Sequence, residues 1–267
     1  MGAVSHPPPR GVLAAFGLVG QAVPLPGGQG ASWRVGEVVL KPHVDADFQQ
    51  WLGTAVSGIE QQGFRLPEVR RAVDGAWVVL GWGAPSLMPG ATVADGAADW
   101  GAIITASRAL HAATADLPRP AFLDLRTDPW AVADRAAWGE TPRRVAPGLR
   151  DLVRRLDAVP APPGGAQLVH GDLAGNVLLV PGAPPSVIDF SPYWRPPSYA
   201  EGIVVADALC WHGAPPEILR DVGVPVEAVA RGLLFRLLAD SGCRSPRGED
   251  VAEHSRRYRS VMKALDL

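Results

Sequence analysis

Lysine and cysteine are almost missing from this sequence. Only Lys41 and Lys263 occur among the 267 residues, so arginine supplies the other 23 of the 25 basic side chains. The two cysteines, Cys210 and Cys243, have neither the number nor the spacing of a disulfide framework or a zinc site. This scarcity excludes a small disulfide-stapled domain and fits a reducing, cytoplasmic compartment. It also makes a lysine at the end of an apolar strand easy to single out.

A surplus of charge and long apolar runs are absent as well. The formal net charge is −2, which argues against nucleic acid or an anionic membrane as a partner. No stretch is long and apolar enough to cross a bilayer. The apolar segment 11–19 could be mistaken for a secretory signal, but three prolines precede it and its basic region is nearly empty. A short surface helix between Pro9 and Gly17 is the favoured interpretation.

The remaining composition is that of a globular protein. Hydrophobic residues make up 47% of the chain and charged residues 19%, which excludes intrinsic disorder. A chain of 267 residues is long for one simple core and comfortable for two lobes that fold as a unit.

The most informative stretch is 168–190, in which polar residues stand where short apolar strands begin or end. Asp172 closes a His-Gly-Asp triplet after the first strand, Asn176 follows four residues later, and Asp189 ends the last strand. A carboxylate that accepts a proton belongs beside a reacting hydroxyl, and an amide oxygen with a second carboxylate suits Mg²⁺. Each residue alone fits a turn or a strand end, but the combination at this spacing favours chemistry.

The segment HGDLAGN, followed thirteen residues later by Asp-Phe-Ser, resembles the catalytic loop and metal-binding segment of the aminoglycoside phosphotransferase family. That family is a branch of the protein-kinase-like fold, whose kinases carry H-R-D-x-x-x-x-N and D-F-G in the same order. The resemblance implies ATP and Mg²⁺ as cofactors. It implies that Asp172 and His170 are catalytic, with His170 shaping the loop, and that Asn176 and Asp189 hold Mg²⁺. Ser191 stands where the kinase motif has glycine.

A glycine-rich turn precedes the first lysine. Gly28, Gly30 and Ser32 lie in this turn, which leads into alternating strand residues that end at Lys41. Glycines let backbone amides approach a phosphate, and the Ser32 hydroxyl adds a donor. Kinase-like folds place their phosphate-pairing lysine on such a strand, so the resemblance implies that Lys41 and this turn bind ATP.

A helix is expected next, at 45–62, because apolar residues recur there at helical spacing and acidic residues occupy its first turn. In the family, a helix at this place supplies a glutamate that pairs with the strand lysine. Glu60 is the only glutamate of this helix and is the candidate partner of Lys41, with Asp47 as a competitor. A solvated helix end is the alternative reading of Glu60.

The segment that follows the N-terminal sheet is the expected binding place of the nucleotide base. The run GWGAPSLMPG leads out of the sheet. In kinase-like folds, backbone groups at this crossing bind adenine, which by the resemblance puts adenine near Ser86, Leu87 and Met88. The hinge is expected at 84–90.

The chain is therefore expected to adopt an α+β, bilobal protein-kinase-like fold. Residues 1–90 form an N-terminal lobe with an antiparallel sheet and one helix. Residues 91–267 form a larger, mainly helical lobe that contains the catalytic loop 168–190. Within that lobe, His111 lies on the apolar face of a long helix, where a hydrogen-bonded structural histidine is more common than a catalytic one.

The tryptophans and the charge balance of the helical half indicate which small molecule could receive the phosphate. A sugar ring can stack on tryptophan, and Trp194 is the best candidate in the helical half because it directly follows the metal-binding segment. The alternative is that these large aromatics belong to the core. Acidic and basic residues are balanced, nine to nine over 91–160 and ten to ten over 190–267. This balance argues against a polycationic aminoglycoside.

Together the motifs predict an ATP-dependent phosphotransferase that moves the γ-phosphate to a hydroxyl of a small molecule, such as a sugar, an amino sugar or an amino alcohol. One alternative is a non-catalytic nucleotide-binding regulator of the same fold, which would be free to lose the base, the lysine or a metal ligand. All of these are retained. The other alternative, a protein kinase proper, would carry the arginine of H-R-D, which is Gly171 here, and a long segment after Asp189.

Overall fold

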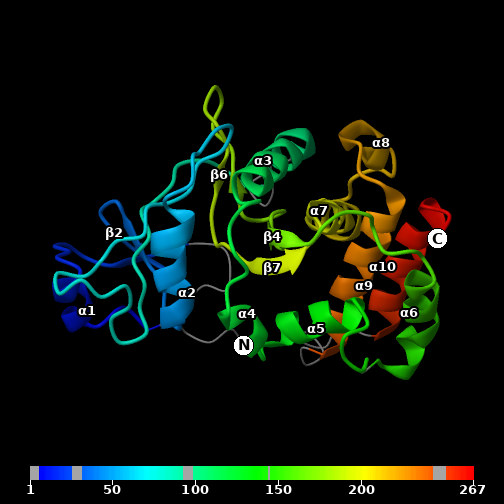
Figure 1. Cartoon of the computed structure of the whole chain (residues 1–267), viewed down its shortest axis with the longest axis horizontal. Coiled ribbons are helices and arrows are strands. Elements are labelled where there is room, and N and C mark those ends of the chain that lie inside the picture. Colours follow the sequence, from blue (N-terminus) through cyan, green and yellow to red (C-terminus); the bar gives the residue numbers. More distant parts are fainter. Residues whose placement is uncertain (1–5, 26–31, 93–98, 144, 243–250) are drawn as a thin grey trace.

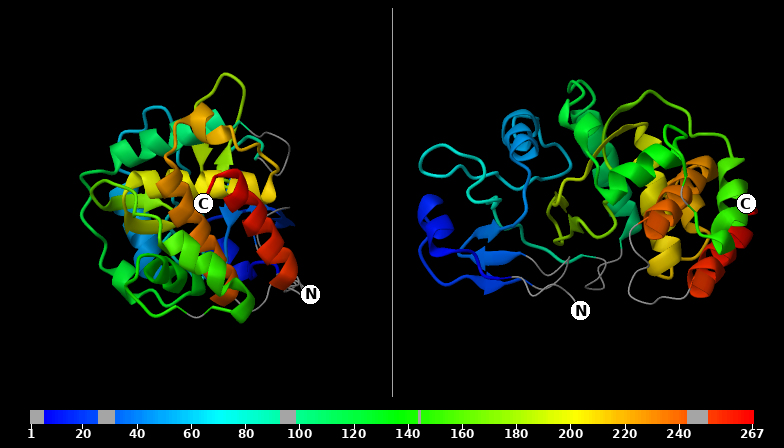
Figure 2. Two further views of the ribbon diagram at one scale, coloured as in Figure 1. Left: turned by 90° about the vertical axis from the view of Figure 1, so that its right-hand side faces the viewer. Right: turned by 90° about the horizontal axis from the view of Figure 1, so that it is seen from below.

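The structure is a computed structural model that describes residues 6–25, 32–92, 99–143, 145–242 and 251–267. Two lobes lie next to each other along the long axis of the molecule (Figure 1), and the right-hand view of Figure 2 shows the same division. The smaller lobe holds the N-terminal sheet, and the larger one carries most of the helices. This arrangement confirms the predicted α+β, bilobal fold class.

The sheet of the smaller lobe has three short antiparallel strands, β1 (Val23–Pro24), β2 (Trp33–Val35) and β3 (Val38–Leu40), in the order β1-β2-β3. Val35 lies opposite Val38, so a two-residue turn joins β2 and β3. The strand pair expected before Lys41 is therefore present, and Lys41 directly follows β3.

Extended segments beyond β3 widen this sheet. The backbones of Lys41 and Gly83 exchange hydrogen bonds of 3.0 and 2.9 Å, and Arg70 donates to the carbonyl of Ala84 at 3.0 Å. Helix α1 (Arg10–Ala15) packs on the sheet rather than lying free on the surface, because two of its apolar side chains join the core of this lobe. That core consists of Val12, Phe16, Val35, Val38, Leu40, Ala72, Trp82 and Ala84.

Helix α2 (Ala46–Trp51) is shorter than expected. It begins at an Asp45 cap, whose carboxylate accepts a hydrogen bond from the Phe48 amide at 2.8 Å. It continues into one widened π-helical turn, Leu52–Val56, and ends there. The helix expected at 45–62 is therefore wrong at its C-terminal end, because the widened turn breaks the α-helical hydrogen-bond ladder.

The larger lobe is built around two long helices that cross its centre. Its helices are α3 (Trp100–Ala113), α4 (Phe122–Leu125), α5 (Pro129–Ala137), α6 (Arg150–Asp157), α7 (Pro197–Trp211), α8 (Ile218–Val222), α9 (Val226–Gly242) and α10 (Val251–Ala264), with a 3-10 turn at Pro147–Leu149. The contact between α7 and α9 is the most extensive between any two described elements. Both are apolar on nearly all sides, as helices at the centre of a core must be.

Glycines set the distance between α7 and α9. A Cβ atom at Gly202 would lie 2.1 Å from the carbonyl oxygen of Ala228, and one at Gly232 would lie 2.7 Å from the backbone of Gly202. The two backbones therefore touch, which no larger residue would permit. This close approach brings Asp207 of α7 into contact with Arg236 of α9.

Two short strand pairs lie between the sheet and the helices (Figure 1). β4 (Gln167–His170) pairs with β7 (Pro192–Arg195), and β5 (Val177–Leu178) pairs with β6 (Ser186–Val187), both antiparallel. These pairs contain the stretch 168–190 on which the sequence interpretation rests.

The β5–β6 hairpin is held from both sides. On one side the amide of Val187 donates to the carbonyl of Arg65 at 2.8 Å. On the other side Ala91 and Leu179 exchange backbone hydrogen bonds of 3.1 and 2.9 Å. Residue 91, at the exit from the smaller lobe, is thus hydrogen-bonded to the segment that follows the predicted catalytic loop.

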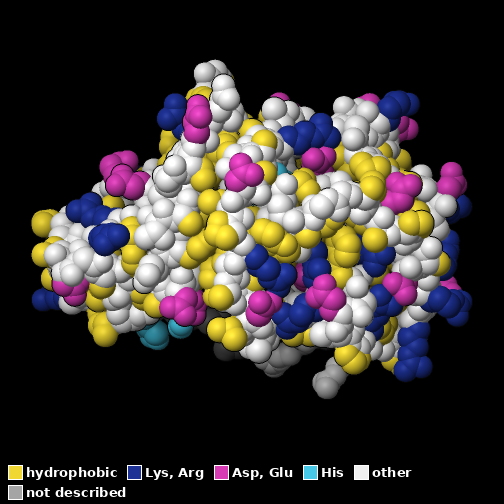
Figure 3. Space-filling model, viewed as in Figure 1, with side chains coloured by type: hydrophobic (Ala, Val, Ile, Leu, Met, Phe, Trp, Pro, Cys, Tyr) yellow, Lys and Arg dark blue, Asp and Glu magenta, His cyan; other side chains and the backbone are white. Residues whose placement is uncertain are grey.

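Within the described ranges, no helix has the length and apolar character needed to span a membrane. On the face shown in Figure 3, acidic and basic side chains are interspersed over the helical lobe, as a net charge of −2 implies.

Candidate active site

A strand pair fixes the start of the predicted catalytic loop. β4 lies against β7, with His170 opposite Pro192. Gly171 donates its amide to the Ser191 carbonyl at 2.9 Å, and a Cβ atom on Gly171 would lie 2.5 Å from the ring of Tyr193. Only glycine fits at this position, so the loop is held against the Asp-Phe-Ser segment.

His170 lies beneath the loop rather than on its surface. Its side chain is fully buried; Nε2 donates to the Ile188 carbonyl at 3.1 Å, and Nδ1 accepts from the Asp172 amide at 3.1 Å. Burial lowers the pKa of His170, which keeps the ring neutral and suits one donor and one acceptor nitrogen. The expectation that His170 is catalytic is corrected here, because a buried ring with both nitrogens engaged cannot touch substrate. Its contacts support the loop-shaping role.

A second buried histidine supports the first. Nε2 of His111 accepts from the His170 amide at 3.0 Å, and Nδ1 lies 3.4 Å from the hydroxyl of Ser107. Burial, with a smaller contribution from the neighbouring His170, lowers the pKa of His111 to about 3. His111 is thus the hydrogen-bonded structural residue that its apolar helix face predicts.

Asp172 and Asn176 are joined directly. The Nδ2 atom of Asn176 donates to the backbone carbonyl of Asp172 at 2.6 Å and to its Oδ2 at 3.1 Å. The side chain of Asp172 remains 47% exposed, which leaves the carboxylate accessible to an incoming hydroxyl. Because the amide nitrogen of Asn176 is used in this way, its oxygen is the atom left for a cation.

The β5–β6 hairpin places Asn176 and Asp189 at the same end of one ladder. Val177 lies opposite Val187, and the Ile188 amide donates to the Asn176 carbonyl at 2.9 Å, so Asp189 directly follows the residue paired with Asn176. Asp189 has a φ of 51°, in the left-handed region that aspartate enters more readily than most residues. The backbone therefore bends at the aspartate itself and not at the serine that replaces the kinase glycine.

Lys41 reaches across from the sheet to this hairpin. Its ammonium forms an ion pair with the Oδ1 atom of Asp189. The lysine side chain is 27% exposed, and burial lowers its pKa to about 8. Two residues that are 148 positions apart in the sequence thus meet at the junction of the lobes.

The predicted partner of Lys41 is corrected by the structure. Glu60 lies beyond the end of the shortened helix, and both it and Asp47 are exposed. Within the described residues, neither carboxylate forms an ion pair with Lys41, whereas Asp189 does. The polar side chain that α2 buries near this strand is Gln49, whose amide lies against Gly83, the residue paired with Lys41.

The donor set at the hairpin fits magnesium. An amide oxygen and a carboxylate are hard ligands, and Mg²⁺ commonly takes only one or two carboxylates and completes its shell with phosphates and water. Asp189 already holds a positive charge, the ammonium of Lys41, so the position accommodates a cation. In the described part of the chain no group of three or more His, Cys, Asp or Glu side chains could hold a metal. A cation held by Asn176 and Asp189 would therefore complete its coordination with phosphates and water.

The predicted phosphate turn is only partly visible. Gly28 and Gly30 lie outside the described residues. Ser32 is described and half-buried, and its carbonyl accepts a hydrogen bond from the Leu25 amide at 2.9 Å, which closes the base of the turn.

The predicted adenine segment lies between β3 and residues 68–70, and its backbone is hydrogen-bonded to both. The amide of Ser86 donates to the Glu68 carbonyl and that of Leu87 to the Glu37 carbonyl, each at 2.8 Å. Both amides are thus occupied by protein, and of the three predicted residues only Met88 has an amide without a partner among the described residues. Recognition of a base through an N–H group at this place would fall to Met88.

A cavity of about 340 Å³ opens beside Asp172. Its lining residues come from the catalytic loop and from helices α5, α7, α9 and α10, with loop residues between them: Trp130, Asp172, Ala174, Gly175, Asp207, Trp211, His212, Arg236, Asp240 and His254. Trp194, the expected substrate contact, instead lies in β7 opposite Leu168 and does not line this cavity. Trp130 and Trp211 are the tryptophans that line it.

The sequence reading missed Arg236 and Asp207. Both are buried, and Nε of Arg236 donates to Asp207 at 2.7 Å while Nη2 donates to Asp172 at 2.6 Å. A signal was available, because Arg236 interrupts the apolar run LLFRLL and a charge within such a run must find a buried partner.

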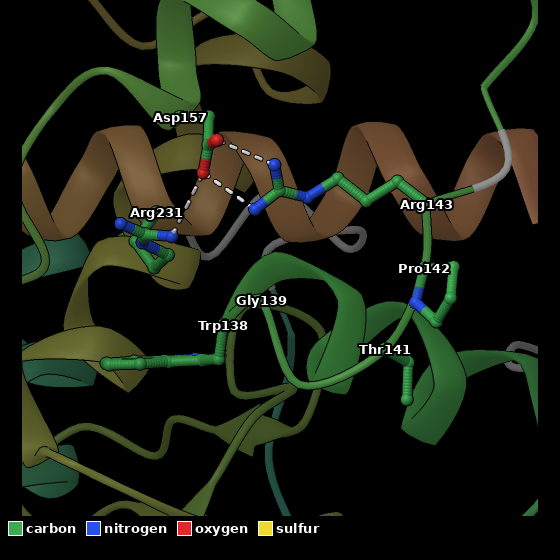
Figure 4. A pocket seen from close by; sticks show the side chains of 7 residues that line it. All are labelled: Trp138, Gly139, Thr141, Pro142, Arg143, Asp157 and Arg231. Carbon is green, nitrogen blue, oxygen red and sulfur yellow. Dashed lines mark hydrogen bonds and ion pairs between the residues drawn. The ribbon is translucent and has the colours of Figure 1, made fainter.

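A larger cavity of about 610 Å³ lies elsewhere in the helical lobe. Figure 4 shows Asp157 between Arg143 and Arg231, with distances from Asp157 oxygens of 2.6 Å to Arg143 and 3.9 Å to Arg231. None of the predicted site residues lines it. The larger volume of this cavity is therefore not matched by predicted site residues; Lys41, Asp172, Asn176 and Asp189 are grouped by their contacts elsewhere in the molecule.

Comparison with known proteins supports the fold at low sequence identity. No protein-family model and no curated protein matches the chain. Solved structures do match. A choline/ethanolamine kinase family protein from Mesorhizobium loti is 19% identical, with a TM-score of 0.56 over 97% of this chain and 94% of that one.

Two antibiotic phosphotransferases are similar to the same extent. A thermostable mutant of aminoglycoside phosphotransferase APH(4)-Ia is 18% identical, with a TM-score of 0.58 over 95% of this chain and 97% of the other. Spectinomycin phosphotransferase APH(9)-Ia in complex with ADP and spectinomycin is 14% identical, with a TM-score of 0.55 over 93% and 92%. The resemblance read from HGDLAGN and Asp-Phe-Ser is thus confirmed in three dimensions: this chain has the protein-kinase-like fold of the aminoglycoside phosphotransferases and choline kinase-like enzymes.

Proposed function

We propose that this protein is an ATP-dependent phosphotransferase that moves the γ-phosphoryl group to a hydroxyl of a small molecule. The observation that carries the proposal is the convergence of four residues from three separate segments. Lys41 contacts Asp189, the β5–β6 ladder links Asp189 to Asn176, and Asn176 donates to Asp172. Phosphoryl transfer needs mainly positioning and charge neutralisation, and these four side chains supply both.

Each residue has a defined task in this proposal. Lys41 exchanges its contact with Asp189 for the nucleotide phosphates. Asn176 and Asp189 hold Mg²⁺, which when bound neutralises charge on the phosphates. Asp172 orients the acceptor hydroxyl and accepts its proton as the new oxygen–phosphorus bond forms and the bond to the leaving ADP oxygen breaks.

The nucleotide lies between the two lobes in this proposal, with 1–90 and 91–267 as the lobes and 84–90 as the hinge. The adenine edge meets the backbone at Met88, and the phosphates lie towards Lys41. The backbone hydrogen bonds between Ala91 and Leu179 support this placement, because they connect the end of the proposed hinge to the β5–β6 hairpin and so to the proposed metal-binding segment. The related fold of spectinomycin phosphotransferase was solved with ADP bound.

The acceptor is a compact hydroxylated molecule. The cavity beside Asp172 is at the small end of the range for ligand sites, about 300–1,000 Å³. Its carboxylates, Asp172, Asp207 and Asp240, outnumber its one arginine, so the charge balance counted along the sequence does not describe this cavity. A sugar, an amino sugar or an amino alcohol fits these dimensions, and a single amine on the acceptor would meet carboxylates.

Two observations favour a small acceptor over a protein. Asp189 is followed after only seven residues by α7, and four of the seven form β7. No long activation segment that would bind a peptide is therefore present between Asp189 and Pro197. The cavity is also bounded by helices of the same lobe.

The test is an acceptor panel with ADP release as the readout. Purified protein with Mg·ATP would be offered sugars, amino sugars and amino alcohols, and each ADP-forming reaction would be checked for a phosphorylated product. Acceptor-dependent ADP release that is absent in Asp172→Asn supports the proposal. Tight nucleotide binding without ADP release for any acceptor would instead favour the non-catalytic regulator.

A further inference from the structure

We propose that Arg236 positions the Asp172 carboxylate for the acceptor hydroxyl, and that Asp207 fixes Arg236 for this task. The inference rests on the proposed function, because it assigns a role to further side chains of the same site. It makes Arg236 a positioning residue on α9, 64 residues beyond the catalytic loop.

The guanidinium of Arg236 bridges two carboxylates, Asp207 and Asp172. Nε of Arg236 donates to Oδ1 of Asp207 at 2.7 Å, and Nη2 donates both to Oδ2 of Asp207 and to Oδ1 of Asp172, the latter at 2.6 Å. Arg236 is 8% exposed and Asp207 is 6% exposed, so the contact between these two side chains is shielded from water. A shielded, bidentate contact is geometrically specific in a way that an exposed ion pair is not.

The charges of the bridge depend on one another. Burial opposes the charge on Arg236, but the carboxylates of Asp207 and Asp172 hold its pKa well above the usual arginine value. Burial also raises the pKa of Asp207, which the guanidinium of Arg236 opposes. Arg236 therefore favours the charged form of Asp207, and the bidentate contact with Asp207 holds the Arg236 guanidinium in one orientation.

The bridge fixes Asp172 from the side opposite Asn176. Oδ1 of Asp172 accepts from Arg236 and Oδ2 accepts from Asn176 at 3.1 Å, so both ends of the carboxylate are held. Asp172, Arg236 and Trp130 line the same cavity, and the Arg236 guanidinium lies over the Trp130 ring at 5.7 Å. A carboxylate held at both oxygens presents its remaining lone pairs in one direction, as a base that must meet a hydroxyl requires.

A contact that served stability alone would not need to reach the loop. Arg236 and Asp207 already form a buried pair, and the extra bond from Nη2 goes to the residue proposed as the base. Arg231 offers the contrast, because it lies on the same helix, is 7% exposed, and donates to the carbonyls of Ala137 and Val159 without contact to Asp172. Arg231 is therefore the matched control.

The test compares Arg236→Met, Asp207→Asn, the double variant Asp207→Asn/Arg236→Met and the control Arg231→Met. The double variant removes both buried charges together, a change that proteins often tolerate, so it remains informative if Arg236→Met does not fold. Three quantities are measured for each: the melting temperature, the dissociation constant of Mg·AMP-PNP, and the rate of ADP release from Mg·ATP with water as the acceptor.

We expect the double variant to bind Mg·AMP-PNP within about twofold of wild type while ADP release falls roughly 10- to 100-fold, the scale for a misplaced catalytic group. Asp207→Asn should give an intermediate rate, because Arg236 keeps its contact with Asp172 but loses its support. Arg231→Met should lose thermal stability and keep its rate.

Three results would overturn the assignment. They are a wild-type rate in the folded double variant, an equal loss of rate in Arg231→Met, and a loss of nucleotide affinity as large as the loss of rate. A wild-type protein that binds Mg·AMP-PNP but releases no ADP with water or any acceptor would refute the proposed function itself, and this role with it.

Discussion

Replacing Gly202 by alanine should separate the two central helices of the larger lobe. The added Cβ would lie 2.1 Å from the carbonyl oxygen of Ala228, although real Cβ contacts below 3.0 Å are essentially never seen. The backbones of α7 and α9 must therefore move apart by about 0.9 Å. No rotamer change can relieve this contact, because the neighbouring atom belongs to the backbone.

The expected cost follows from two opposing effects. Overpacking costs typically about 1–3 kcal/mol, and a rigid backbone neighbour places Gly202→Ala at the upper end of that range. Alanine regains about 1 kcal/mol of helix propensity over glycine. The net loss is about 2 kcal/mol, which corresponds to a fall in melting temperature of roughly 4–8 °C for a chain of this size.

Thermal unfolding followed by circular dichroism checks this value, with Gly11→Ala as the control. Gly11 also lies in a helix, and nothing stands within 4 Å of its Cβ position, so that variant should be unchanged or slightly more stable. Because Asp207 and Arg236 meet through the same helix contact, Gly202→Ala should also slow ADP release. An unchanged or higher melting temperature for Gly202→Ala would refute the argument that this glycine sets the helix spacing.

Three further predictions concern the site itself. Lys41→Ala should weaken binding of Mg·AMP-PNP by about 1.5–3 kcal/mol in calorimetric titration, the scale of a charge-assisted hydrogen bond, and unchanged affinity with unchanged turnover would remove Lys41 from the site. Asp189→Asn should lose metal-dependent nucleotide affinity and turnover together, whereas Asp172→Asn should keep affinity while turnover falls about 10²–10⁴-fold; the same profile in both would show that the roles are wrongly divided. His111 has a folded-state pKa of about 3, below its unfolded value of about 6.5, so its contribution to stability is complete above pH 6.5 and is lost at up to ~1.4 kcal/mol per pH unit as the pH falls towards 3. Denaturant titrations at several pH values should show that the free energy of unfolding falls less steeply with acid in His111→Gln than in wild type. Equal slopes in the two proteins would contradict a buried neutral His111.

The sequence predicted those parts of the site that depend on local pattern. HGDLAGN and Asp-Phe-Ser occupy short strands and the turns between them, so their spacing already fixes which side chains stand at the strand ends. Lys41 was recognisable because a lone lysine ends an apolar strand. The bilobal fold followed from the change from strand to helix periodicity near residue 90 together with the family resemblance.

Features that depend on tertiary contact were missed or misplaced. Glu60 was expected to face Lys41, but the expected helix ends early in a π-helical turn, which apolar periodicity does not reveal. The pairing of Lys41 with Asp189 joins residues that are 148 positions apart, which no local sequence pattern reveals. Trp194 is the tryptophan favoured by its place in the sequence. In the structure it pairs with Leu168 in the β4–β7 ladder and does not line the cavity that Trp130 and Trp211 line.

Arg236 illustrates a signal that can be used in other chains. An arginine inside LLFRLL and an aspartate inside a buried apolar helix each require a partner of opposite charge, and each is the other's. The pairing itself could not be deduced, because it depends on two glycines that let α7 and α9 touch.

The most direct measurement of the central claim is phosphorus NMR of a reaction that contains Mg·ATP, the protein and one acceptor from the panel. Phosphotransfer predicts that the γ-phosphate resonance of ATP disappears as the resonances of ADP and one phosphate monoester of the acceptor grow in equal amounts, and that none of these changes occurs with Asp172→Asn. An ATP spectrum that stays constant for every acceptor while calorimetry shows bound nucleotide would contradict the claim.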